Sequence, residues 1–119
     1  MRYSSYKTGI LEIDIQHANI AFMLTELAKE GSEKEVSERK FEIIRNALAH
    51  HFDFEEKWGQ ANNRNFDSDH RDSHKELLEK LNELYNQYTN NKLNMCEISL
   101  TTKMELLKHV QNHDMRLNA

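Results

Sequence analysis

Apolar residues recur at alternating steps of three and four from residue 10 onward, which is the spacing of one face of an α-helix. The first stripe predicts a helix over about 10–30 that ends at Gly31. After a charged linker the stripe resumes and predicts a second helix over about 36–58. These two stripes consist of Ile10, Ile13, His17, Ile20, Leu24 and Leu27, and of Phe41, Ile44, Leu48, His51, Glu55 and Trp58.

Two more stripes follow a polar, turn-rich segment that runs from Gly59 to Ser68, and they predict helices over about 68–89 and 95–117. Helices of about 20 residues with short connections fold back beside one another. We therefore predict an all-α fold, an up-down-up-down antiparallel four-helix bundle, as a single domain over 1–119 with an N-terminal arm over 1–9. The stripes consist of His70, His74, Leu77, Leu81, Leu84 and Tyr88, and of the broader set Ile98, Leu100, Met104, Leu106, Leu107, Val110 and Leu117.

The composition supports this fold and excludes several classes of protein. The 119 residues contain no proline and three glycines, so long helices can run without breakers. A net charge of −4 without a basic cluster argues against nucleic acid as a partner. A single cysteine, Cys96, cannot form an internal disulfide, and we expect it to be a small packing residue.

Membrane insertion and secretion are not expected for this segment. The longest apolar run, from Ile20 to Leu24, is far shorter than the roughly 20 residues that cross a bilayer. The first residues, MRYSSYKTG, lack the apolar core of a signal peptide. We expect a cytoplasmic protein.

Histidines and a glutamate interrupt the apolar stripes at positions that should face the core. They are His17, His51, Glu55, His70 and His74. A buried imidazole or carboxylate without partners costs several kcal/mol, so facing helices that bury five such groups need something that binds them all. The pattern predicts a metal site, and we consider solvated histidines on an ordinary bundle the weaker reading.

The spacing of these residues narrows the kind of site. A zinc protease has glutamate directly after the first histidine of its motif, whereas Arg71 follows His70 here. Ferritin-like centres use glutamate three residues before histidine, and Asp14 and Asp67 stand at such positions instead. Asp14 could accept a hydrogen bond from an imidazole or lie solvated at a helix start. An imidazole-rich site with few carboxylates suits iron, copper or zinc.

Taken in order, the motifs resemble the hemerythrin family, in particular the bacteriohemerythrins and hemerythrin-like domains. That family has one histidine in the first helix, then H-F-x-x-E-E, H-x-x-x-H and H-x-x-x-x-D in the following three. The chain has His17, then HFDFEE from His51, HRDSH from His70 and HVQNHD from His109. The resemblance covers nearly the whole chain.

The resemblance implies two non-haem iron ions joined by a bridging oxo or hydroxo group. By this resemblance His70, His74 and His109 bind one iron, His17 and His51 bind the other, and Glu55 and Asp114 bridge them. Dioxygen would bind at the open position of the iron with two histidines, inside walls formed by Phe52, Leu106 and Val110. Spacing alone would instead pair His109 with His113, because Asp114 lies about 140° from His109 on an ideal helix.

The function implied by the resemblance is reversible dioxygen binding for transport or storage, without enzymatic activity. One alternative is an oxygen or redox sensor domain of a larger bacterial signalling protein, such as a chemoreceptor or a diguanylate cyclase. It is suggested by the chain's stopping five residues after Asp114 without a recognisable helix cap, which implies a C-terminal output domain or partner. The other alternative is peroxide or nitric oxide chemistry at the same irons, which turnover with peroxide would reveal.

Overall fold

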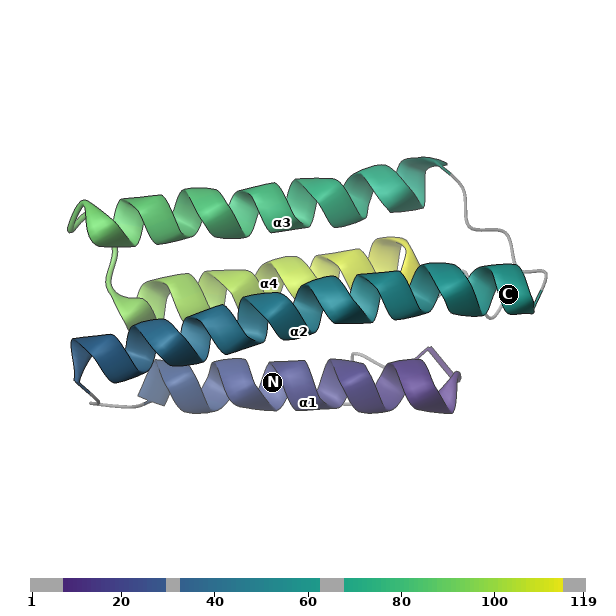
Figure 1. Cartoon of the computed structure of the whole chain (residues 1–119), viewed down its shortest axis with the longest axis horizontal. Helices are drawn as coiled ribbons and strands as arrows, with labels where there is room; N and C mark the ends of the chain where they lie inside the picture. Colours follow the sequence, from purple (N-terminus) through teal and green to yellow (C-terminus); the bar gives the residue numbers. More distant parts are fainter. Residues whose placement is uncertain (1–7, 30–32, 63–67, 115–119) are drawn as a thin grey trace.

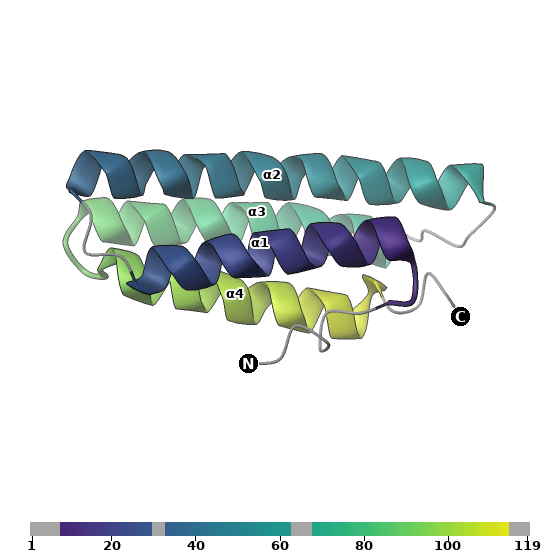
Figure 2. The same cartoon turned by 90° about the horizontal axis from the view of Figure 1, so that it is seen from below.

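The protein is a bundle of four helices in the computed structural model, which describes residues 8–29, 33–62 and 68–114. The helices are α1 (Leu11–Lys29), α2 (Lys34–Ala61), α3 (Ser68–Thr89) and α4 (Met95–Asn112). Successive helices run in opposite directions (Figures 1 and 2). Helix α1 packs against α2 and α4, and α3 packs against the same two helices. The described residues contain no strand. The predicted all-α, four-helix fold is confirmed.

The start of α1 is fixed by Asp14. Its carboxylate accepts hydrogen bonds from the backbone and hydroxyl of Thr8 and from the amide of Gly9. Gly9 has a φ of 90°, a left-handed conformation that glycine adopts without steric cost, and it turns the chain back toward that carboxylate. Asp14 therefore ties Thr8 and Gly9, which precede α1, to the first turn of this helix, and neither of these partners is an imidazole.

The observed helix ends differ from the predicted ones in α2 and α4. Helix α2 continues past Trp58 through Gly59 to Ala61, because a single glycine costs a helix about 1 kcal/mol and does not end it. Helix α4 begins with a capping box formed by Asn94 and Glu97, but it ends at Asn112 rather than at 117. Residues 30–32, including the predicted stop at Gly31, and 115–119 lie outside the described part of the chain.

The apolar stripes of all four helices meet in one core. Every apolar member of the first stripe is buried, and Phe41, Leu48 and Leu81 are completely enclosed. Trp58 is only half-buried and packs with Phe54 against a smaller apolar cluster. One half of the bundle thus has an apolar core that stabilises the fold, and the other half contains the buried histidines.

Three sequence expectations about α4 need correction or fall outside the structure. Leu100 and Met104 were expected in the core, but each is 46% exposed, because α1 and α3 cover only the side of α4 that carries Leu106 and Val110. Cys96 is exposed and is not a packing residue. Leu117 lies beyond the described residues.

Among the described residues, no helix combines the length and the apolar character that a membrane span needs.

Candidate metal centre

The polar core residues gather at one end of the bundle, where α1 and α3 begin and α2 and α4 end (Figures 1 and 2). All seven are buried, and three of them, His17, Glu55 and Asp114, have no exposed surface. The alternating direction of the helices produces this arrangement, because it brings the first turns of one pair level with the last turns of the other. The residues that lie together are His17, His51, Glu55, His70, His74, His109 and Asp114.

These side chains form two overlapping groups that could each hold a metal ion. One group contains three histidines, from α3 and α4, and the other contains two, from α1 and α2. Glu55 and Asp114 belong to both groups. Within each group, one ligand atom per residue lies within 4.8 Å of the ligand atoms of all the other residues. The first group consists of Glu55, His70, His74, His109 and Asp114. The second consists of His17, His51, Glu55 and Asp114.

Asp114 lies between the two groups and turns one oxygen toward each. Its Oδ1 is 2.7 Å from Nε2 of His70 and 2.8 Å from Nε2 of His109. Its Oδ2 is 2.9 Å from Nε2 of His17. A carboxylate held in this way can bridge two ions.

Glu55 takes a similar central position on α2. Its Oε1 lies 2.7 Å from Nε2 of His51, one turn earlier on the same helix, and 3.7 Å from Nε2 of His74. Its Oε2 lies 3.7 Å from Nε2 of His70. Neither oxygen accepts a hydrogen bond with acceptable geometry, although both are buried. A buried carboxylate in that condition is costly unless a cation is present to compensate it.

Burial strongly lowers the pKa values of two histidines in the site. Burial and the nearby His17 lower the pKa of His51 to about 3. Burial and the nearby His109 and His70 lower the pKa of His74 to about 2. Neutral imidazole is the form that binds metals, so at neutral pH both rings are ready to do so.

The two carboxylates respond to burial in opposite ways. Burial and the nearby Asp114 raise the pKa of Glu55 well above its ordinary value. Burial by itself would also raise the pKa of Asp114, but the adjacent imidazole of His109 and the hydrogen-bonded imidazoles of His17 and His70 outweigh it and hold this pKa well below the ordinary value. Without a metal, the site therefore keeps Asp114 charged and favours a proton on Glu55.

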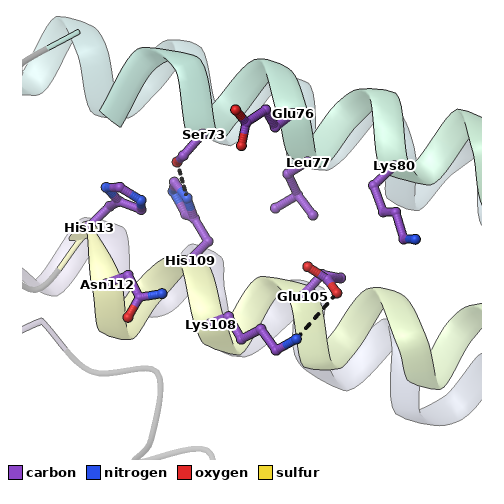
Figure 3. A pocket seen from close by; sticks show the side chains of 9 residues that line it. All are labelled: Ser73, Glu76, Leu77, Lys80, Glu105, Lys108, His109, Asn112 and His113. Carbon is purple, nitrogen blue, oxygen red and sulfur yellow. Dashed lines mark hydrogen bonds and ion pairs between the residues drawn. The ribbon is translucent and has the colours of Figure 1, made fainter. Parts of the chain in front are cut away.

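Two residues that the sequence did not single out orient the imidazoles from outside. The Nδ1 atom of His51 lies 2.6 Å from Oε1 of Gln16, to which it donates, so its bare Nε2 faces Glu55. The Nδ1 atom of His109 lies 2.6 Å from the hydroxyl of Ser73, as Figure 3 shows. Such partners fix the tautomer and the ring orientation of ligands. Gln16 precedes His17 and Ser73 precedes His74, but no pattern in the sequence distinguishes them from other polar residues.

The residues expected to wall the ligand pocket are all buried near the histidines. Phe52 stacks on His74, with ring centroids 4.0 Å apart, and its ring centroid lies 5.3 Å from that of His109. Leu106 and Val110 have no exposed surface. All three residues belong to the main apolar core, which Phe52 joins to the histidines, and their role as pocket walls stays a prediction.

Grooves approach the site from two sides. Figure 3 shows the groove between α3 and α4, in which charged residues such as Glu76 and Lys108 surround His109. A second groove, between α1 and α2, reaches His51 past Met23 and Ala47. His50, which neighbours His51 but is outside the proposed ligand set, is exposed.

His113, which is not among the ligands that the family resemblance implies, lies close to the site. The centroid of its ring lies 5.4 Å from those of His70 and His109, and its plane is inclined by 29° and 31° to theirs. It therefore covers two proposed ligands on the side of the α3/α4 groove (Figure 3).

The donor set fits a pair of transition-metal ions. Five imidazoles and two carboxylates favour iron, copper, nickel or zinc over magnesium or calcium, which prefer oxygen ligands. Two shared carboxylates further favour a pair of ions over a single one. No family model, curated protein or solved structure matches this chain, so no relative indicates which metal it binds.

Proposed function

We propose that the protein is a non-haem di-iron protein that binds dioxygen reversibly, as an oxygen carrier or store of the hemerythrin type. The observation that carries the proposal is the sharing of Glu55 and Asp114 between two unequal groups of histidines. A shared pair of carboxylates suits a dinuclear centre. Three histidines on one side and two on the other leave one ion with a position for an exchangeable ligand.

The charges of the site support an iron pair. Two ferrous ions bring four positive charges, and Glu55, Asp114 and one hydroxide bring three negative charges, so little net charge would be buried. The raised pKa of Glu55 is consistent with this balance, because the carboxylate gives up its proton readily only when positive charge is placed beside it.

The protein's own residues would keep the ligand site dry and the imidazoles in place. Phe52, Leu106 and Val110 supply apolar surface and no proton donor, which favours binding of an apolar gas and its release unchanged. Gln16 and Ser73 hold the rings of His51 and His109 with Nε2 inward. Iron, when bound, would supply the electrons that make dioxygen binding reversible.

The proposal is tested by loading the protein with ferrous iron without air and recording its iron content and visible spectrum before and after air is admitted. We expect about two irons per chain and new iron-to-ligand bands that disappear when oxygen is removed. His74→Ala should lack the bands, whereas His50→Ala, which changes an exposed histidine beside a proposed ligand, should retain them.

The outcomes separate the candidate functions. Bands that appear and vanish with oxygen over several cycles support a carrier or store. Absence of stoichiometric iron would overturn the proposal, and sustained consumption of peroxide or nitric oxide would replace it with an enzymatic function.

A further inference from the structure

Two grooves lead to the proposed metal centre, and their linings differ in chemistry. The groove between α1 and α2 reaches His51 past Ile20 and Met23, and no carboxylate lines it among the described residues. The groove between α3 and α4 reaches His109, and of the described residues that line it Leu77 alone is apolar (Figure 3). A cation leaves water at lower cost where polar groups replace its hydration, so the α3/α4 groove is the better path for an incoming metal ion.

The α3/α4 groove offers possible ligand atoms at increasing depth. Glu76 on α3 and Asn112 on α4 line it and are exposed. His113 is half-buried, and its ring lies beside that of His109, which is buried. An ion that moves inward along these residues can exchange its water for protein ligands in steps, so that it is not buried without partners.

The charged side chains leave the His113 end of the groove favourable to a cation. Nζ of Lys108 is paired with Oε1 of Glu105, at 3.6 Å. Lys80 lies one turn farther along α3 than Glu76, away from His113 (Figure 3). Glu76 is therefore the first charge on the α3 wall that an ion meets at this end, and its carboxylate attracts cations.

His113 lies where the groove meets the proposed centre, but it is not a member of either ligand group. The centroid of its ring is 5.4 Å from that of His70 and 5.4 Å from that of His109. Imidazoles this close can pass an ion from one to another without its return to bulk water. A nitrogen donor next to the site and outside its ligand set suits a transfer ligand better than a permanent one.

His113 also precedes the carboxylate that both groups share. Helix α4 ends at Asn112, and His113 and Asp114 lie in the turn that follows. The amide of His113 donates to the carbonyl oxygen of His109, at 2.9 Å, which holds this turn against the helix end. The donor at the groove and the carboxylate at the centre of the site are thus consecutive residues.

We propose that His113 is the entry ligand of the centre: it takes a metal ion from the α3/α4 groove and passes it to His70 and His109. The inference rests on the proposed metal centre, but it requires neither iron nor dioxygen. Because His113 is outside both ligand groups, it should speed the uptake and the release of an ion by the same factor and leave the equilibrium affinity unchanged.

Stopped-flow mixing of the metal-free chain with Co²⁺ tests this, because Co²⁺ accepts imidazole and carboxylate ligands and reports its binding through visible absorption bands. His113→Ala should slow both uptake and release into excess chelator by about 10-fold or more, with the dissociation constant changed by less than about 2-fold. His113→Phe keeps a ring beside His70 and His109 but has no donor atom, and it should be as slow. His50→Ala, which changes the exposed histidine of the other groove, should be as fast as the unchanged protein.

A second pair of variants tests the groove independently of His113. Glu76→Gln should slow uptake by about 3-fold at low salt, because one attractive charge is lost. Glu79→Gln, which alters an exposed carboxylate of α3 outside the lining of the groove, should not.

The sign of the change in His113→Ala decides between a transfer ligand and a cover. Faster uptake in this variant would show that the ring only obstructs the groove, and it would overturn the proposal. So would an unchanged rate, or an equal slowing in His50→Ala. Failure of the unchanged protein to bind Co²⁺ would overturn the metal centre as well, whereas full binding of Co²⁺ with unaltered rates in both His113 variants would overturn this inference alone.

Discussion

Nε2 of His17 and Oδ2 of Asp114 lie 2.9 Å apart, although the two residues are separated by 97 positions in the chain. This contact joins the first helix to the turn after the last one. Asp114 also reaches His70 and His109, so a single carboxylate connects three of the four helices.

Asp114→Asn should reduce the iron bound per chain from about two to one or fewer, because a neutral amide is a poor bridge between two cations. Iron analysis after gel filtration measures the change. Asp69→Asn, which alters an exposed carboxylate on α3, should leave the content unchanged. Full iron content in Asp114→Asn would contradict a bridging role.

Gln16→Ala should weaken metal binding by about 10- to 100-fold, because His51 loses the acceptor that fixes its tautomer. Competition with a chelator of known affinity measures the loss. Asn19→Ala, in the same groove but without a contact to His51, is the control. Equal affinities for the two variants would show that the Gln16 contact does not orient the ring.

Glu55→Gln should have opposite effects with and without metal. In the metal-free protein it should raise the free energy of unfolding by about 1 kcal/mol, because it removes a buried ionisable group that accepts no well-formed hydrogen bond. With metal it should forfeit the stabilisation that a ligand bound only to the folded state provides, about 4 kcal/mol at a thousand times the dissociation constant. Urea unfolding with and without iron measures both, and a destabilised metal-free variant would contradict the argument.

Acid should destabilise the metal-free protein from about pH 6.5 downward. His51, with a pKa of about 3, and His74, with a pKa of about 2, stay neutral in the folded chain but take up protons near pH 6.5 when it unfolds. The unfolded state then binds more protons, so stability falls as the pH drops from about 6.5 toward 3. The two histidines alone would give a slope of up to about 2.7 kcal/mol per pH unit, and Glu55, whose pKa is raised in the folded chain, acts in the opposite direction above pH 4.5 and reduces it.

Urea midpoints measured between pH 7 and pH 4.5 test this slope. His74→Gln should flatten it and His50→Gln should not, since His50 is exposed in the folded chain. A midpoint that does not change over this range would show that the buried histidines are already charged.

Phe52→Leu should shorten the life of the oxygenated protein by opening the apolar wall beside His74. The half-life of the visible bands in air measures the effect. Phe41→Leu removes an equally buried ring that stacks on Tyr85 instead of on a histidine, so it should cost similar stability and leave the half-life unchanged. Equal half-lives for the two variants would show that Phe52 does not form part of the wall of the ligand pocket.

The sequence predicted the helices well because their signal is local. The alternation of three and four depends only on neighbouring residues, and the stripes through His17, His51 and His70 proved to be buried as expected. The predicted stripe on α4 included residues that are exposed, because periodicity does not show how much of a helix is covered by its neighbours. Met104 is the clearest case.

The site was harder to predict where it departs from helical geometry. His109 and Asp114 point apart on an ideal helix, but α4 ends at Asn112, and Asp114 lies in the tight turn that follows. There its carboxylate reaches back to His109 within 2.8 Å. Family resemblance predicted this pairing, and spacing did not. Gln16 was missed because its partner, His51, lies on another helix 35 residues away.

The placement of Asp114 also determines when the metal centre can come into being during synthesis. The helices depend on nearby residues and can form while the chain is still emerging, since local structure forms quickly and long loops close later. The group that contains His17 needs Asp114 as well, so it is incomplete until the chain has been made at least that far. Metal uptake into the shared site is therefore a late event, and a chain interrupted just before Asp114 would carry all five histidines on their four helices without the carboxylate that connects them.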